Sequence, residues 1–412
     1  MNALEHPDPY DPTDPGVIAD PYPALATLRS RSPVAWSERL RSWLVTRHDD
    51  CIALQRDPRL SAERMAAYFQ GLSDERRRAL AMSERMIGTW SVFLDPPPHT
   101  RIRSHLNRWF TTRSLEAMKP RIERRIDDLL VPVRERERMD FVADFAYPLP
   151  AGVIMDMLGV PLELLADFQR WSHDVALFVG SSQTAPDKHH RAEEAIVGLA
   201  AVFRDLLAER RRAPDADMIS ELARQPGLSD DELVANCILL LFAGHETTTG
   251  LLSNGLMRLI EHPGQQALLR REPGRAEMAV EEMLRFDSPA PAISRVAATD
   301  LELRGRRISR GDRVFLMLNA ANRDPDAFDE PDRFDITRRA GRHIAFGFGI
   351  HFCIGAPLAR LEATLALPRV LAALDDIEQT DDAVTWRDGV SLRGLVSLPI
   401  RYRGRRAGPG TA

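Results

Sequence analysis

The longest helical pattern in the chain runs from Ser229 to Gly264, and it sets the size of any structure that forms around it. Ser229 and Glu232 have the spacing of a capping box at its start, and the stretch His262-Pro263-Gly264 ends it. About 30 residues at roughly 1.5 Å each give a rod of about 45 Å, which crosses a whole domain. Its centre is apolar on nearly every side, so we expect it to be buried.

The other periodic segments are shorter. Residues 120–136 and 192–212 carry apolar side chains at helical spacing. Strand-like segments are short and gathered in two places, which are residues 33–37 and 42–47 near the N-terminus and residues 295–318 and 389–403 late in the chain. We therefore predict a mainly α fold with small, mostly antiparallel sheets.

Composition narrows the class of protein. The chain has 412 residues, of which 44% are hydrophobic, and a net charge of −5, so a large core is possible and neither nucleic acid nor an anionic membrane is indicated as a partner. The start of the chain has no apolar signal-peptide core, and the longest strongly apolar run, residues 238–244, is far shorter than the roughly 18 residues of a membrane span. Cys51, Cys237 and Cys353 are scattered and odd in number, which favours a reducing cytoplasm over a disulfide framework.

One cysteine lies between a glycine-rich loop and a helical pattern, in the stretch FGFGIHFCIG at residues 346–355. Cysteine acts as a ligand or nucleophile as thiolate, and a helix N-terminus stabilises an anion by about 0.3–1 kcal/mol. The glycines also permit sharp turns and the close approach of a flat ligand. A lone cysteine here would more often be a structural residue, but the complete spacing F-G-x-G-x-H-x-C-x-G favours a ligand.

This spacing resembles the haem-binding loop of the cytochrome P450 family. The resemblance implies that haem b is the cofactor and that Cys353 is the axial thiolate on its iron. It also implies that Phe346 packs against the haem and the sulfur, and that His351 reaches a haem propionate.

The long helix carries the stretch FAGHETTT at residues 242–249. A glycine and hydroxyl side chains inside a helix suit a local opening, and an acid beside a hydroxyl suits proton delivery, although a plain buried helix with a polar patch also fits. The stretch resembles the family's oxygen-activation motif. The resemblance implies that Glu246 and Thr247 are the catalytic acid–alcohol pair and that Ala243 and Gly244 lie against the haem.

Three basic residues resemble the family's other propionate anchors. His99 and Arg103 lie four apart in a helical pattern that follows Pro96-Pro97-Pro98, and Arg295 lies ten residues after Arg285. By themselves His99 and Arg103 would be read as part of a solvated basic helix face.

The stretch EEMLRF places Glu282 and Arg285 three apart, which by itself predicts an ordinary ion pair. It also resembles the family's ExxR element, where an arginine of a later P-[ED]-R-F segment joins the pair. By that resemblance Arg333 would complete a buried, structural trio, because two guanidinium groups can satisfy one carboxylate.

The resemblance runs from about residue 20 to residue 402. It implies a single haem domain over residues 20–402, after an N-terminal extension at residues 1–19 and before a tail, residues 403–412, that we expect to be disordered. The implied activity is monooxygenation, in which one atom of O2 enters a small, largely apolar molecule by hydroxylation or epoxidation, in natural-product tailoring or on a steroid- or terpene-like compound.

Three alternatives remain open. The same oxidant can serve oxidative coupling, ring closure or desaturation. A peroxide-driven enzyme and a non-catalytic recruitment module are disfavoured, because relatives of those kinds lack residues that this chain has. By family position, the candidate pocket residues are Met82, Met86, Trp90, Val92, Phe93, Val175, Phe178, Leu239, Phe242, Ala243, Ala290, Ala292, Ile293 and Leu392.

Monooxygenation needs two electrons, and three cysteines cannot supply the four thiolates of an iron–sulfur cluster. We therefore expect a monomer that receives electrons from a separate ferredoxin and ferredoxin reductase. By family architecture, the docking face would be lined by Arg101, Arg108, Arg113, Arg342 and Arg360.

Overall fold

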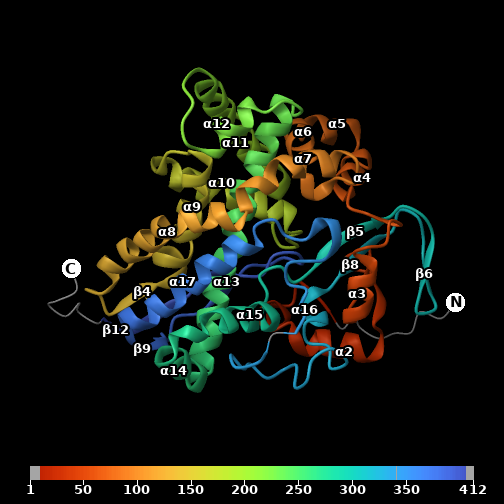
Figure 1. The fold of residues 1–412 in the computed structure, drawn as a ribbon. Coiled ribbons are helices and arrows are strands. Elements are labelled where there is room, and N and C mark those ends of the chain that lie inside the picture. Colours follow the sequence, from red (N-terminus) through yellow and green to blue (C-terminus); the bar gives the residue numbers. More distant parts are fainter. Residues whose placement is uncertain (1–9, 340, 405–412) are drawn as a thin grey trace.

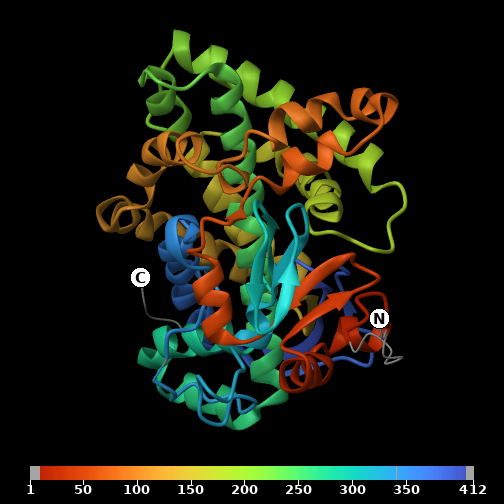
Figure 2. The ribbon, with the colours of Figure 1, turned by 90° about the vertical axis from the view of Figure 1, so that its right-hand side faces the viewer.

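The computed structural model describes residues 10–339 and 341–404, and the helix α13 (Asp230–Glu261) passes through their centre, as Figures 1 and 2 show from two sides. The capping box is present: the Glu232 N–H donates to Ser229 Oγ (3.3 Å), and the Ser229 N–H donates to the Glu232 carboxylate (2.8 Å). His262 ends the helix, and the next helix begins at Pro263.

Helices surround α13. It packs against α9, α11, α15 and α17. The bounds are α1 Pro15–Ala19, α2 Tyr22–Arg31, α3 His48–Leu54, α4 Arg64–Gln70, α5 Asp74–Ala79, α6 Ala81–Ile87, α7 Pro98–Leu106, α8 Thr112–Val133, α9 Pro148–Leu158, α10 Leu165–Val179, α11 Lys188–Arg212, α12 Met218–Arg224, α14 Pro263–Arg271, α15 Ala276–Phe286, α16 Leu318–Ala321 and α17 Ala356–Ala373.

The strands form small sheets on two sides of α13: in Figure 1, β4, β9 and β12 lie on the left, and β5, β6 and β8 lie on the right. The largest has the order β1-β2-β8-β5-β3, in which β2 and β8 run parallel and the other neighbours antiparallel. The smaller sheets are β4-β12-β9, β6-β7 and β10-β11. The bounds are β1 Val34–Ser37, β2 Ser42–Val45, β3 Leu60–Ser61, β4 Arg138–Asp140, β5 Ile293–Ala297, β6 Leu301–Leu303, β7 Arg306–Ile308, β8 Arg313–Leu316, β9 Leu374–Gln379, β10 Thr385–Trp386, β11 Leu395–Ser397 and β12 Pro399–Gly404. The predicted mainly α fold with small antiparallel sheets is confirmed, with one parallel pair.

Element boundaries depart from the sequence pattern in two places. The helix expected from residue 120 begins at Thr112, where the Thr111 hydroxyl accepts the Ser114 N–H, and it continues through Pro120. Arg403 and Gly404 belong to β12, so the tail expected to be disordered begins at residue 405 at the earliest. Residues 405–412 lie outside the described residues.

The residues just before the expected haem domain pack onto it. Tyr10 is buried, and the Arg393 guanidinium donates to the carbonyls of Ile18 and Ala19 (2.7 and 2.9 Å). In the described ranges, no helix has the length and hydropathy that crossing a bilayer requires.

Candidate active site

A cavity of about 260 Å³ lies between α13, α15, α17 and the loop that precedes α17. Its wall brings together the cysteine, the threonine and most of the basic residues that the sequence singled out. Twelve of the predicted site residues line the cavity, and they are Val92, Arg103, Leu239, Ala243, Gly244, Thr247, Ala290, Ile293, Arg295, Phe346, His351 and Cys353.

Cys353 is placed by the turn before α17. Its N–H donates to the Phe346 carbonyl (2.9 Å), and its sulfur lies 3.9 Å from where a Cβ on Gly355 would stand. Burial raises the pKa of the Cys353 thiol, and the backbone N–H groups of Gly355 and Ala356, together with the Arg103 guanidinium, oppose this only in part. The helix end therefore does not ionise the thiol on its own, whereas a coordinated metal ion deprotonates a thiol outright.

The loop glycines have a role that the sequence did not predict. Gly347 and Gly349 adopt φ of 71° and 75°, which favours glycine. A Cβ on Gly347 would stand 3.2 Å from Gln55 Oε1, and one on Gly349 would stand 3.2 Å from the Gln55 carbonyl oxygen. These glycines therefore let the loop approach the end of α3, and Gly347 also lies at the cavity wall.

Arg103, Arg295 and His351 line the cavity, and His99 packs against His351. The rings of His99 and His351 lie 4.3 Å apart, and both nitrogens of His99 and Nδ1 of His351 are buried without a hydrogen-bond partner among the described residues. Burial, followed by Arg295 and His99, lowers the pKa of His351 to about 3, and burial lowers the pKa of Arg295 to about 10.

Buried donors without a partner and buried positive charges cost folding free energy unless an anion pairs with them. Such a donor set fits a flat group that carries two carboxylates beside Cys353. These four residues would hold the propionates of a haem.

The acid and the alcohol of α13 face different surroundings. The Thr247 hydroxyl lines the cavity and donates to the Ala243 carbonyl (3.2 Å). Glu246 is buried outside the cavity wall, where Arg387 Nη1 donates to its Oε2 (2.5 Å) and His245 Nε2 lies 3.5 Å from Oε1. Burial would raise the pKa of Glu246, but Arg387 and then His245 lower it to about 2.

The glycine and the threonines suit a local opening of the helix at this point. α13 stays continuous, and Gly244 instead admits Ile154 of α9, whose Cγ1 would lie 2.8 Å from an added Cβ.

Many of the apolar residues predicted for the pocket do not line the cavity. Trp90 is fully buried and stacks on Phe93 and Phe242, with ring centroids 5.8 and 5.7 Å apart. Phe178 packs on Tyr68, and Leu392 packs against Gly180. Those that pack elsewhere are Met82, Met86, Trp90, Phe93, Val175, Phe178, Phe242, Ala292 and Leu392.

The predicted structural trio has a different third member. Arg285 holds both oxygens of Glu282 (2.7 and 2.8 Å), and both side chains are buried. The Arg333 side chain is 57% exposed and pairs with Glu330, so the prediction for it was wrong. Arg338 takes its place, 3.3 Å from Glu282 Oε1, because the Asp335 N–H also donates to Glu282 (3.0 Å) and turns the chain back there.

Sequence reasoning missed several residues that contact the cavity or its polar groups. Thr248, Ile154, Gln55 and Pro289 line the cavity, and Arg387 holds Glu246. Thr248 follows Thr247 and could have been found from the motif, whereas Arg387 is far away in the sequence and carries no local signal.

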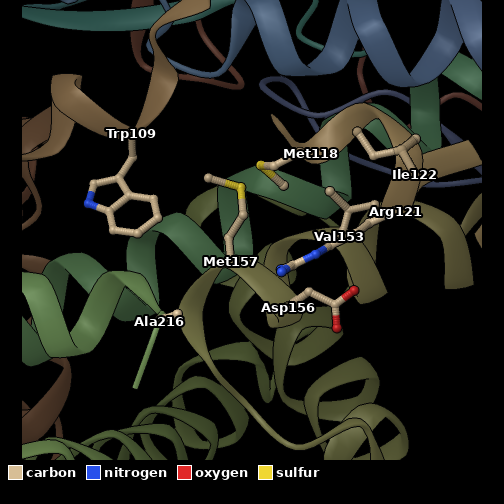
Figure 3. Close-up of a pocket in the computed structure, with 8 residues that line it drawn as sticks. All are labelled: Trp109, Met118, Arg121, Ile122, Val153, Asp156, Met157 and Ala216. Carbon is tan, nitrogen blue, oxygen red and sulfur yellow. The ribbon is translucent and has the colours of Figure 1, made fainter. Parts of the chain in front are cut away.

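A second, smaller hollow lies between α8, α9 and Trp109, and Figure 3 shows the side chains that line it. Its volume is about 50 Å³, and it shares no lining residue with the cavity at Cys353. Since one water occupies about 30 Å³ of the liquid, this hollow has room for little more than water.

The chain matches the family model described as "Cytochrome P450" over residues 56–385. This chain belongs to the cytochrome P450 family. It is 40% identical to the cytochrome P450 YjiB of Bacillus subtilis, with 92% of this chain and 93% of that protein covered. It is 38% identical to the vitamin D(3) 25-hydroxylase of Pseudonocardia autotrophica, with 94% and 95% covered.

The fold is shared with a solved cytochrome P450. The crystal structure of P450BioI in complex with hexadec-9Z-enoic acid ligated acyl carrier protein matches with a TM-score of 0.87 and 33% identity, covering 94% of this chain and 100% of that chain. As a cytochrome P450, the chain is an oxidoreductase of the monooxygenase type with a haem-thiolate cofactor. When bound, haem supplies the iron at which O2 is reduced.

Proposed function

We propose that this cytochrome P450 inserts one oxygen atom of O2 into a small, largely apolar molecule, and that the other atom leaves as water. The reaction takes up two electrons and two protons for each product molecule. The observation that carries the proposal is the single cavity whose wall holds both the Cys353 sulfur and the Thr247 hydroxyl.

The chain's own residues would divide the work. Cys353 would be the axial ligand, and His99, Arg103, Arg295 and His351 would hold the propionates. The Thr247 hydroxyl would pass protons into the cavity, since it lies at the wall and can both donate and accept.

The substrate would be small and largely apolar. The part of the wall beyond the basic residues includes Val92, Leu239, Leu240, Ala290, Ile293 and Leu318, which offer no fixed charge. The relative named as a vitamin D(3) hydroxylase supports hydroxylation of a steroid-like compound. The relatives named as a polyketide biosynthesis cytochrome P450 and as a 6-deoxyerythronolide B hydroxylase support the alternative, natural-product tailoring.

The first test is the haem spectrum. The reduced protein under carbon monoxide should show the strongly red-shifted Soret band of thiolate ligation, and Cys353→Ala should abolish it. Cys237→Ala is the matched control, because Cys237 is buried in α13 and does not line the cavity. A Cys353→Ala protein that keeps the band would show that another residue ligates the iron.

The second test identifies the reaction. Steroids, terpenes and macrolides should be screened for a substrate-induced change of the haem spin state, and the ligands found should then be turned over under 18O2 with a ferredoxin and its reductase. We expect a product with one labelled oxygen. A product that has lost two hydrogens without gaining oxygen would instead support coupling, ring closure or desaturation.

A further inference from the structure

Glu246 is held by a segment that also holds a distant turn. The connection from β10 to β11 contains Arg387 and Asp388, which are adjacent in the chain and bind different partners. Arg387 pairs with Glu246, and only 18% and 5% of the two side chains are exposed. The Arg387 N–H donates to the Gly394 carbonyl (2.9 Å), so the backbone that carries the guanidinium is itself fixed.

Asp388 binds the turn between α10 and α11. Its carboxylate accepts the hydroxyls of Ser182 (2.9 Å) and Thr184 (2.7 Å) and the N–H groups of Gln183 (3.1 Å) and Thr184 (3.0 Å). Burial would raise the pKa of Asp388, but these hydrogen bonds lower it. The Gly180 carbonyl accepts the N–H groups of Val390 and Ser391. The turn and the β10–β11 connection are therefore joined at several points.

The ion pair between Arg387 and Glu246 affects how Glu246 can transfer protons. Neighbouring residues of an α-helix point about 100° apart, which is why Glu246 faces Arg387 while Thr247 faces the cavity. Glu246 would have to rotate away from Arg387 to pass a proton toward Thr247. A buried carboxylate does not leave its ion pair unless it gains a proton or another partner.

The other titratable groups near Glu246 do not replace Arg387. His245 Nδ1 donates to the Leu241 carbonyl (2.6 Å), and Tyr147 stands edge-on to His245 with ring centroids 5.4 Å apart. His173, on α10, lies within electrostatic reach of both Glu246 and Arg387, and burial followed by Arg387 lowers its pKa. Arg387 is the cation that contacts Glu246 most closely in the described structure.

We propose that Arg387 is a positioning residue that controls when Glu246 can deliver a proton toward Thr247, and that Asp388 ties this control to the α10–α11 turn. The inference rests on the proposed monooxygenase function. If the α10–α11 turn separated from Asp388, the β10–β11 connection would become more mobile and the Arg387–Glu246 ion pair would weaken.

The first test measures the pair without turnover, from the urea midpoint of the haem-bound protein at pH 7.5 and pH 5.5. In Arg387→Gln, Glu246 loses its cation and its pKa rises above the unfolded value. The folded state then gains a proton, so stability relative to wild type should improve as the pH falls. Arg387→Lys is the matched control and should follow wild type at both pH values.

The double variant decides whether Arg387 acts through Glu246. In a Glu246→Gln background, Arg387→Gln should cost the same at both pH values. If Arg387→Gln has a pH-independent cost in the wild-type background as well, the two groups are not coupled and the proposal is overturned.

The second test follows protons during turnover, with a ferredoxin, its reductase and vitamin D(3) as the probe. Peroxide released per NADPH should stay level between pH 6 and 8 in wild type and Arg387→Lys, and should vary with pH in Arg387→Gln. Equal behaviour of Arg387→Gln and Arg387→Lys would overturn the inference while leaving the haem-thiolate spectrum, and so the proposed function, intact.

The link to the turn has its own control. In Asp388→Ala, the urea midpoint relative to wild type should depend on pH in the same direction as we expect for Arg387→Gln, but more weakly. Asp382→Ala should not, because Asp382 bonds only within its own loop, to Thr380. If the two aspartate variants behave alike, the turn does not act on Glu246.

Discussion

Thr247 and Thr249 are two residues apart on α13, and their hydroxyls lie in different surroundings. Thr247 lines the cavity, whereas the Thr249 hydroxyl is buried away from it with no hydrogen-bond partner in the described chain. We predict that Thr247→Ala lowers product formation about 10²-fold, the lower end of what general acid catalysis contributes. Reductant should still be consumed, with more peroxide released. Thr249→Ala makes the same chemical change and should leave the ratio of product to NADPH near wild type. Full coupling in Thr247→Ala would remove this hydroxyl from the mechanism.

Arg333 and Arg338 also differ in their surroundings, because only the Arg338 side chain contacts Glu282. Arg338→Ala removes a cation from a fully buried carboxylate that keeps Arg285, so we expect a loss of about 1–3 kcal/mol in the free energy of unfolding. Arg333→Ala removes an exposed side chain and should stay within about 0.5 kcal/mol of wild type. Urea unfolding of both variants measures the difference, and equal losses would contradict the assignment of Arg338.

Residue identity could be predicted from sequence only where a motif fixes the spacing. Cys353, Thr247 and His351, which the motifs single out, line one cavity. The second cation at Glu282 was missed because Arg333 and Arg338 are both close enough in the chain to reach it. The turn at Asp335, which no motif describes, decides between them.

At the scale of elements, the approach of α13 to α9 depends on Gly244. An alanine there gains up to about 1 kcal/mol of helix propensity. Its Cβ would lie 2.8 Å from Ile154 Cγ1, and such overpacking costs about 1–3 kcal/mol. We therefore predict that Gly244→Ala destabilises the protein, as measured by urea unfolding. The double variant Gly244→Ala/Ile154→Ala should lose less than the sum of the two single variants, and simple additivity would rule out the contact as the cause.

Long elements could be predicted from the sequence, and short ones could not. α13 has a capping box, an apolar centre and a proline stop, which agree with one another. β3 and β10 have two residues each, too few for a period of two to be visible. The apolar segment around Trp90 was assigned to the pocket because apolar residues suit either a pocket wall or a core. Only the stacking of Trp90 on Phe93 and Phe242 shows that it belongs to the core.

At the scale of the whole molecule, the arginines expected at a docking face differ in whether they already have an acidic partner. α17 follows Cys353 and packs against α8, and Arg108 and Arg113 lie in and just before the first turn of α8. Two of the five arginines expected at a docking face are already paired. Arg101 binds Glu232, and Arg360 holds Glu281 (2.6 Å).

Arg108, Arg113 and Arg342 are exposed and have no acidic partner in the described part of the chain, so of the five arginines they are the ones we expect to attract an acidic electron donor. An acidic ferredoxin would be steered by such charges, and steering raises association rates about 10- to 10³-fold at low salt. We predict that Arg108→Glu/Arg113→Glu lowers the rate of reduction by a ferredoxin about 10-fold at low ionic strength. The difference should shrink at high salt, because the Debye length falls from about 10 Å at 0.1 M to about 3 Å at 1 M. The matched control is Arg306→Glu/Arg310→Glu, which makes the same charge change at the β6–β7 hairpin, away from α17 (Figure 1). Stopped-flow reduction at two salt concentrations measures both pairs, and equal slowing by the two would show that net charge, rather than this face, sets the rate.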